Sequence, residues 1–287
     1  MSELTILYED DHLLAVDKPA GLLMHPSWLD KAETDTLAGR VKRYWQGAKV
    51  HTIHRLDRPT SGVVLIARTD AVARTLADAF RERRVSKSYW AIARGFTDQS
   101  IDCDYPLKEE LDAIADRQAR TDKEAQPART LFRRLGISAL DTPVSRYPQA
   151  RFSLLECQPQ TGRKHQIRRH LKHLRHPILG DTRYGDRHQN RWAKAHLPYD
   201  GLMLRAMQLG FEHPVTGIYT VIFAGLSPQW QAVINRFGWV GRGVAAADAA
   251  QLAEAQLRVA GAEAAQTEAL PAHSPQAVLL NPSVEKS

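Results

Sequence analysis

A run of five apolar, mostly β-branched residues at positions 63–67 (VVLIA) most constrains the fold of this chain. Such a run has no polar face, so it predicts a strand that is covered on both sides within a sheet. The stripe formed by Val72, Leu76 and Phe80 follows at helical spacing and predicts a helix directly after the strand. The chain therefore has to supply packed layers on both faces of its sheet.

The order of the other patterns predicts the fold class. Strand and helix patterns are interleaved, several strand patterns are joined by turns, and the regular alternation of a doubly wound sheet is missing. Predicted strands lie at 5–8, 13–16, 88–94, 151–157, 203–209 and 219–223, and predicted helices at 37–44, 163–176 and 230–237. The polar residues 107–135 predict a helix or an irregular excursion. We expect an α+β fold with a mixed, mainly antiparallel sheet and flanking helices.

The composition changes after Trp239. Residues 243–267 are alanine-rich and predict an exposed helix, whereas residues 268–287 contain three prolines and predict disorder. We expect residues 1–240 to form the catalytic domain and residues 241–287 to be a tail.

Charge and targeting signals narrow the function class. The net charge is +7, and the tail holds three basic and five acidic side chains, which leaves +9 on residues 1–240. A basic body favours a polyanionic partner, nucleic acid first, although a solvated surface gives the same count. The N-terminus is acidic where a signal peptide is basic, and no apolar run is long enough to span a bilayer. With only two cysteines, we expect a cytoplasmic protein without membrane contact.

The segment 54–62 (HRLDRPTSG) precedes the buried strand and carries the first candidate site. A loop at the end of a core strand is held rigidly and can present side chains to a ligand. Asp57 lies between Arg55 and Arg58, and nearby cations keep a carboxylate ionised, as a nucleophile or a base requires. A structural salt bridge in the loop explains the same pattern, and spacing alone favours that simpler interpretation.

The segment 161–176 (TGRKHQIRRHLKHLRH) holds six Lys or Arg and four His without any acid. An apolar stripe runs along one side of the predicted helix, and cations on another side favour phosphate binding. A solvated basic helix is the alternative. Candidate RNA contacts here are Arg163, Lys164, His165, Arg169 and Lys172. A metal site is disfavoured because no cysteine or carboxylate joins the four histidines.

Tyr89, in a predicted strand, fits either a core position or a site position where it stacks on a base or moves a proton. No GxGxxG or Walker A motif is present, so we expect no nucleotide cofactor.

Five segments together resemble the RluA-type pseudouridine synthases. They occur in the family's order and cover roughly residues 4–225. The segments are KPAG at 18–21, HRLDRPTSG at 54–62, SKSYWAIARG at 86–95, TGRKHQIRRHL at 161–171 and HPILGD at 176–181.

The resemblance implies a pseudouridine-synthase fold with a central RNA-binding cleft, no cofactor and no metal. It implies that Asp57 is the catalytic aspartate, that Arg168 pairs with it, and that Tyr89 stacks on the flipped uracil and helps to remove the C5 proton. It also implies that Arg55 fills the gap in the RNA stack, and that Lys18 and Pro19 support the site.

Within the family, the chain is similar to members that modify uridine 65 of tRNA. The similarity rests on segments 25–30, 105–128 and 162–181, while His188 departs from the pattern. With the first strand at about residue 4, we expect no S4-like domain, and we expect a monomer. The alternatives are a ribosomal RNA synthase of the same family and a non-catalytic RNA-binding protein.

Overall fold

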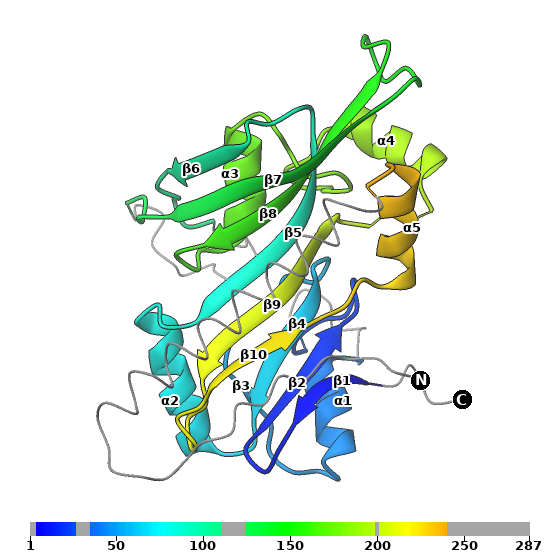
Figure 1. Ribbon diagram of the computed structural model, residues 1–287. Helices are drawn as coiled ribbons and strands as arrows, with labels where there is room; N and C mark the ends of the chain where they lie inside the picture. Colours follow the sequence, from blue (N-terminus) through cyan, green and yellow to red (C-terminus); the bar gives the residue numbers. More distant parts are fainter. Residues whose placement is uncertain (1–3, 27–34, 111–123, 199–200, 240–287) are drawn as a thin grey trace.

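The structure is a computed structural model that describes residues 4–26, 35–110, 124–198 and 201–239. Within these ranges the strands form one twisted sheet in the order β1-β2-β4-β9-β5-β8-β7-β6, with β3 beside β4 and β10 beside β9 (Figure 1). Each neighbouring pair is antiparallel except β4 and β9, which are parallel. The predicted α+β class with a mixed, mainly antiparallel sheet is confirmed.

The elements have the following bounds. The strands are β1 (Thr5–Glu9), β2 (Leu13–Lys18), β3 (His51–Thr52), β4 (Ser61–Ala67), β5 (Ser86–Arg94), β6 (Ser100–Asp104), β7 (Arg129–Leu140), β8 (Ala150–Pro159), β9 (Leu204–Glu212) and β10 (Tyr219–Phe223). The helices are α1 (Leu37–Tyr44), α2 (Asp70–Arg81), α3 (Gln166–His173), α4 (Arg187–His196) and α5 (Pro228–Arg236).

Strand β4 is buried on both faces, as the apolar run predicts. Val63 and Leu65 point into a core that α2 covers, while Val64 and Ile66 point into a second core that α1 covers. Both helices begin at a threonine N-cap whose hydroxyl accepts a backbone N–H of the first turn. The alternation of side chains along one strand thus places one helix on each side of the sheet.

The other half of the sheet carries the remaining helices around a larger core. Figure 1 shows α3 behind β6, β7 and β8. Gln166 and His170 of α3 are hydrogen bonded to the Thr130 hydroxyl of β7 at 2.9 Å each. Phe152 of β8 contacts Trp192 of α4 with ring centroids 5.1 Å apart, which ties α4 to the same sheet.

The two halves join at the short parallel pairing of β4 with β9. Gly62 lies at this join with φ +114°, and a Cβ there would lie 2.0 Å from the Ala206 carbonyl oxygen. Only glycine therefore permits the two strands to approach each other here. The Asp57 loop enters β4 immediately before this join.

Several elements differ from the sequence-based expectation. Strand β7 begins within the segment 107–135, which predicted a helix or irregular structure, because pairing with β6 and with the next strand, β8, extends its polar sequence. The helix predicted over 163–176 is shorter, since His165 adopts a left-handed conformation at its start. Helix α4 and strand β6 were not predicted. The expected tail, 241–287, lies outside the described residues.

None of the helices in the described parts of the chain is long and apolar enough to cross a membrane.

Candidate active site

The loop that carries Asp57 connects β3 to β4 and is fixed at its start and its middle. His54 Nε2 accepts a hydrogen bond from the backbone N–H of Leu65 in β4 at 2.9 Å. Leu56 is 4% exposed and packs in the core beneath α1. Asp57, the next residue, points the other way and keeps 23% of its side chain exposed. The loop therefore presents this carboxylate from a rigid base.

Lys18 at the end of β2 is hydrogen bonded to the same loop. Its buried Nζ donates to the carbonyl oxygens of Pro19 at 2.9 Å, Leu22 at 2.8 Å and Arg58 at 3.1 Å. Burial lowers the pKa of Lys18 to about 7, and the charge of Asp57 opposes this effect. The structure thus places Lys18 where it links the KPAG turn to the loop that carries Asp57.

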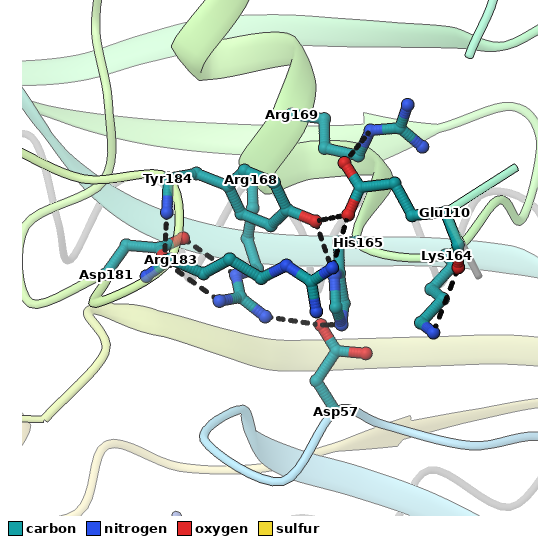
Figure 2. Close-up of polar contacts among 9 residues, drawn as sticks. All are labelled: Asp57, Glu110, Lys164, His165, Arg168, Arg169, Asp181, Arg183 and Tyr184. Carbon is teal, nitrogen blue, oxygen red and sulfur yellow. Dashed lines mark hydrogen bonds and ion pairs between the residues drawn. The ribbon is translucent and has the colours of Figure 1, made fainter. Parts of the chain in front are cut away.

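Arg168 of α3 reaches the Asp57 carboxylate. Its Nη1 lies 3.1 Å from Oδ2 of Asp57, and the Nε2 of His165 lies 3.7 Å from the same oxygen (Figure 2). Arg168 is 5% exposed, so this ion pair lies largely out of water, where charges interact more strongly. The fold thus brings together two residues that are 111 positions apart in the sequence.

Asp181 holds the other side of the Arg168 guanidinium. Its two carboxylate oxygens accept Nε at 2.7 Å and Nη2 at 2.8 Å, so the guanidinium is fixed in a bidentate fork. Burial opposes ionisation of Asp181, yet Arg168 and the backbone N–H groups of Tyr184 and Arg183 hold its pKa below the usual value. Asp181 therefore aims the remaining N–H of Arg168 at Asp57.

A group of polar side chains extends from the far side of His165. His165 Nδ1 lies 2.8 Å from the Tyr184 hydroxyl. That hydroxyl donates to Glu110, whose carboxylate also pairs with Arg183 and Arg169 (Figure 2). A continuous set of contacts thus runs from Asp57 to a carboxylate nearer the surface.

Tyr89 lies on β5, opposite Cys157 of β8 and Ala206 of β9, and is half-buried. Burial first, and then the charge of Asp57, raise the pKa of its hydroxyl well above the usual value. The phenol is therefore neutral.

The comparisons with known proteins show the family of the chain. A family model described as RNA pseudouridylate synthase matches residues 12–173, more than half of the chain. The chain belongs to the RluA-type pseudouridine synthases.

The similarity to individual relatives extends beyond the family model. The chain is 49% identical to a protein of Salmonella typhi named tRNA pseudouridine synthase C. The match extends over 238 residues, which are 83% of this chain and 91% of that one. A longer protein of the same name from Pectobacterium carotovorum is 47% identical. That match covers 83% of this chain and 63% of the Pectobacterium protein. The solved structure of human RNA pseudouridylate synthase domain containing 4 is 27% identical, with a TM-score of 0.61 over 82% of this chain and 93% of that one.

In this pseudouridine synthase the predicted RNA-binding cations lie on two segments. Arg55 and Arg58 are exposed on the Asp57 loop, and Arg58 Nε donates to the carbonyl of Gly21 at 3.0 Å. Three cations near the start of α3 donate to backbone carbonyl oxygens. Arg163 donates to residue 127, Lys164 to residue 110 and Arg169 to residue 108. Lys172 lies one turn further along α3, 5.7 Å from the ring centroid of Tyr184.

The four histidines of this region point to separate partners. His170 is bonded to the Thr130 hydroxyl and to the Tyr105 carbonyl, and His176 is bonded to the carbonyl of Arg94. His173 stacks on Tyr105 with ring centroids 3.7 Å apart. Each ring is therefore used in the packing of α3, while His165 alone faces Asp57.

The sequence reasoning missed four residues of this pseudouridine synthase site. It assigned no role to Glu110, Asp181, Arg183 or Tyr184. Asp181 is the last residue of HPILGD at 176–181, and Glu110 lies within 105–128, so both residues belong to segments that resemble the family. Their roles could not be read from these segments, because the fold decides which partner a carboxylate meets.

Proposed function

We propose that this protein isomerises uridine to pseudouridine in tRNA, at position 65. The observation that carries the proposal is the Asp57–Arg168 ion pair, held by Asp181, in a chain 49% identical to an enzyme named tRNA pseudouridine synthase C. A protein that only bound RNA would gain nothing from a partly exposed carboxylate among cations, because that carboxylate repels phosphate.

The reaction breaks the N1–C1′ bond, turns the uracil, and forms a C5–C1′ bond. The proton leaves C5, N1 gains a proton, and no electron or group is exchanged with a second substrate. Asp57 contributes a lone pair, either by attack at C1′ or by removal of the C2′ proton. Arg168 stabilises the ionised carboxylate and orients it in a largely desolvated position.

Tyr89 and Arg55 would handle the flipped nucleotide. Extrusion of a base from a stack costs about a few kcal/mol, and the exposed Arg55 side chain, two residues from Asp57, would fill the vacated place. The neutral ring of Tyr89 would stack on the uracil. Because the pKa of its hydroxyl is raised, Tyr89 would accept the C5 proton only as it gives up its own.

We also propose the RNA contacts, the cofactor requirement and the location of the protein. Six side chains would contact the RNA backbone around Asp57: Arg58, Arg163, Lys164, His165, Arg169 and Lys172. An isomerisation needs no redox group or activated donor, which supports work without a nucleotide cofactor. We propose residues 1–240 as the catalytic domain of a monomer in the cytoplasm.

The test is a tritium-release assay on unmodified tRNA that carries tritium at C5 of uracil. Wild-type protein should release tritium, and carbodiimide-dependent primer extension should stop at position 65. Asp57→Asn should release none while it still binds the RNA, because the amide can act neither as nucleophile nor as base. The matched control is Asp98→Asn, which removes an exposed carboxylate in the loop between β5 and β6.

Other outcomes would change the proposal in definite ways. A stop elsewhere in tRNA would keep the reaction and discard the position. Release only from ribosomal RNA would replace the substrate. Normal turnover by Asp57→Asn would refute the assigned role of Asp57.

A further inference from the structure

The carboxylate of Glu110 occupies a site built from groups that bind anions. The Tyr184 hydroxyl donates to it, Arg183 Nη2 lies 2.8 Å away, and Arg169 Nε lies 3.4 Å away (Figure 2). Two guanidinium groups and a phenol around one acid are the kind of donor set that also binds phosphate.

The backbone of residues 108–110 lies against Arg169 and a further cation, Lys164. Lys164 Nζ donates to the carbonyl of Glu110 at 3.2 Å, and Arg169 Nη2 donates to the carbonyl of Lys108 at 2.8 Å. Residues 108–110 therefore satisfy with protein oxygens several donors at the start of α3 that RNA oxygens could satisfy instead.

Tyr184 and the backbone of Arg183 have contacts that do not involve Glu110. Tyr184 is 7% exposed, and three cations surround its ring, with Arg168 at 5.1 Å, Arg183 at 5.6 Å and Lys172 at 5.7 Å from the centroid. The backbone N–H groups of Arg183 and Tyr184 are both bonded to Oδ1 of Asp181 at 2.9 Å. The site should therefore persist when the Glu110 carboxylate leaves.

Glu110 is an exchangeable ligand, in contrast to the ion pair beneath it. The Glu110 and Arg183 side chains are 30% and 44% exposed, whereas Arg168 and Asp181 are 5% and 0% exposed. Partly exposed ion pairs contribute little net stability, so another anion can replace one partner at small cost. Water therefore reaches this carboxylate.

The site is close to the reacting position. His165 contacts Asp57 Oδ2 at 3.7 Å through Nε2 and the Tyr184 hydroxyl at 2.8 Å through Nδ1. One imidazole ring thus separates Asp57 from the hydroxyl that binds the anion. A nucleotide whose sugar lies at Asp57 carries its own backbone phosphates within this neighbourhood.

We propose that Arg169, Arg183 and Tyr184 form a binding site for one backbone phosphate of the substrate RNA, and that Glu110 occupies this site until the RNA displaces it. The inference rests on the proposed RNA substrate and adds a subsite to it. In the free protein, Glu110 satisfies the cations; in the complex, a phosphate diester takes its place.

The displacement has a measurable consequence for RNA affinity. In wild-type protein the phosphate must compete with a tethered carboxylate, which weakens binding. When residue 110 is neutral, no carboxylate competes at this position, and phosphate binding releases the small counterions that replace it. Glu110→Gln should therefore bind RNA several-fold more tightly, and its binding should lose affinity with salt more steeply, by about one unit of the log–log slope.

The experiment measures the Kd of full-length protein for unmodified tRNA over a range of salt concentrations. The variants are Glu110→Gln, Arg183→Ala and the double variant, with Asp98→Asn as the charge-matched control. Arg183→Ala should weaken binding, and most of the gain from Glu110→Gln should be lost in the double variant, because the phosphate then lacks the more exposed of its two guanidinium partners. Asp98→Asn should change neither the Kd nor the slope as strongly as Glu110→Gln.

Weaker or unchanged binding by Glu110→Gln would overturn the proposal, since Glu110 would then organise the arginines or play no part. A gain that persists in the double variant would also overturn it. The tritium-release assay separates the two proposals: activity with no effect of Glu110→Gln on binding rejects the phosphate site alone. The expected binding changes without activity on any RNA would reject the proposed reaction and retain the phosphate site.

Discussion

Arg168 can serve Asp57 only if its guanidinium is oriented. A guanidinium carries five N–H donors in a planar fork, and rotation about its side chain would turn them away from Asp57. Asp181 takes Nε and Nη2 and leaves Nη1 for Asp57. Asp181 therefore acts through Arg168 as a positioning residue and has no contact of its own with Asp57 among the residues that the structure describes.

We predict that Asp181→Asn lowers kcat by about 10-fold to 100-fold and changes KM little, because a misplaced ion pair costs orientation in the reacting state. In an Arg168→Ala background the same change should cost much less, since Asp181 then has nothing to orient. Single-turnover kinetics of the two single variants and the double variant measure this coupling.

The control for this prediction is Asn190→Ala. Asn190 bonds the carbonyl of Asp181 and the N–H of Gly180, so its loss loosens the same loop without touching the carboxylate. Equal losses of kcat from Asp181→Asn in both backgrounds would show that Asp181 only stabilises the fold.

The Asp57 loop depends on the way three elements meet at His54. The ring accepts the N–H of Leu65 in β4 and stacks on Phe80 of α2 with centroids 4.9 Å apart. Burial, with a smaller effect from the charge of Lys87, lowers the pKa of His54 to about 4. Protonation would remove the acceptor for the backbone N–H of Leu65, so the His54 ring is neutral in the folded protein.

Stability should therefore fall as the pH drops from about 6.5 to about 4. In that window the unfolded chain binds a proton at residue 54 and the folded chain does not, which favours unfolding by at most about 3 kcal/mol. Urea unfolding of wild type and His54→Gln at several pH values measures this contribution. His54→Gln keeps an acceptor and should lack this part of the pH dependence; an identical profile for both proteins would contradict the role of His54.

At the scale of the whole molecule, the site lies where two halves of one sheet meet. Asp57 comes from the half built on β1, β2 and β4, and Arg168 comes from α3 on the half built on β5 to β8. The last residue that the structure describes is Trp239. It is 7% exposed and packs against Phe237 and Gly136. The catalytic pair thus depends on the relative placement of both halves.

We predict that deletion of residues 241–287 leaves the melting temperature and pseudouridine formation unchanged, because the described residues up to Trp239 pack into a core of their own. Trp239→Ala in the full chain should lower the free energy of unfolding by about 3 kcal/mol through a cavity beside Gly136. Thermal unfolding and tritium release on both variants provide the measurement. A loss of activity after the deletion would place part of the substrate site in 241–287.

The sequence by itself determined the local features of this protein. The run at 63–67 has no polar face and could only become a buried strand, and the order of motifs identified the family and the region of Asp57. These features are readable because hydrophobic period and motif spacing are local properties of the chain.

The tertiary structure alone decided which distant residues meet. The parallel contact of Gly62 in β4 with Ala206 in β9 joins the two halves of the sheet. The pairs of Arg168 with Asp57 and of Glu110 with Arg183 join residues 111 and 73 positions apart. A charged side chain carries no local sign of its partner, because that choice depends on which segments the packed core brings together.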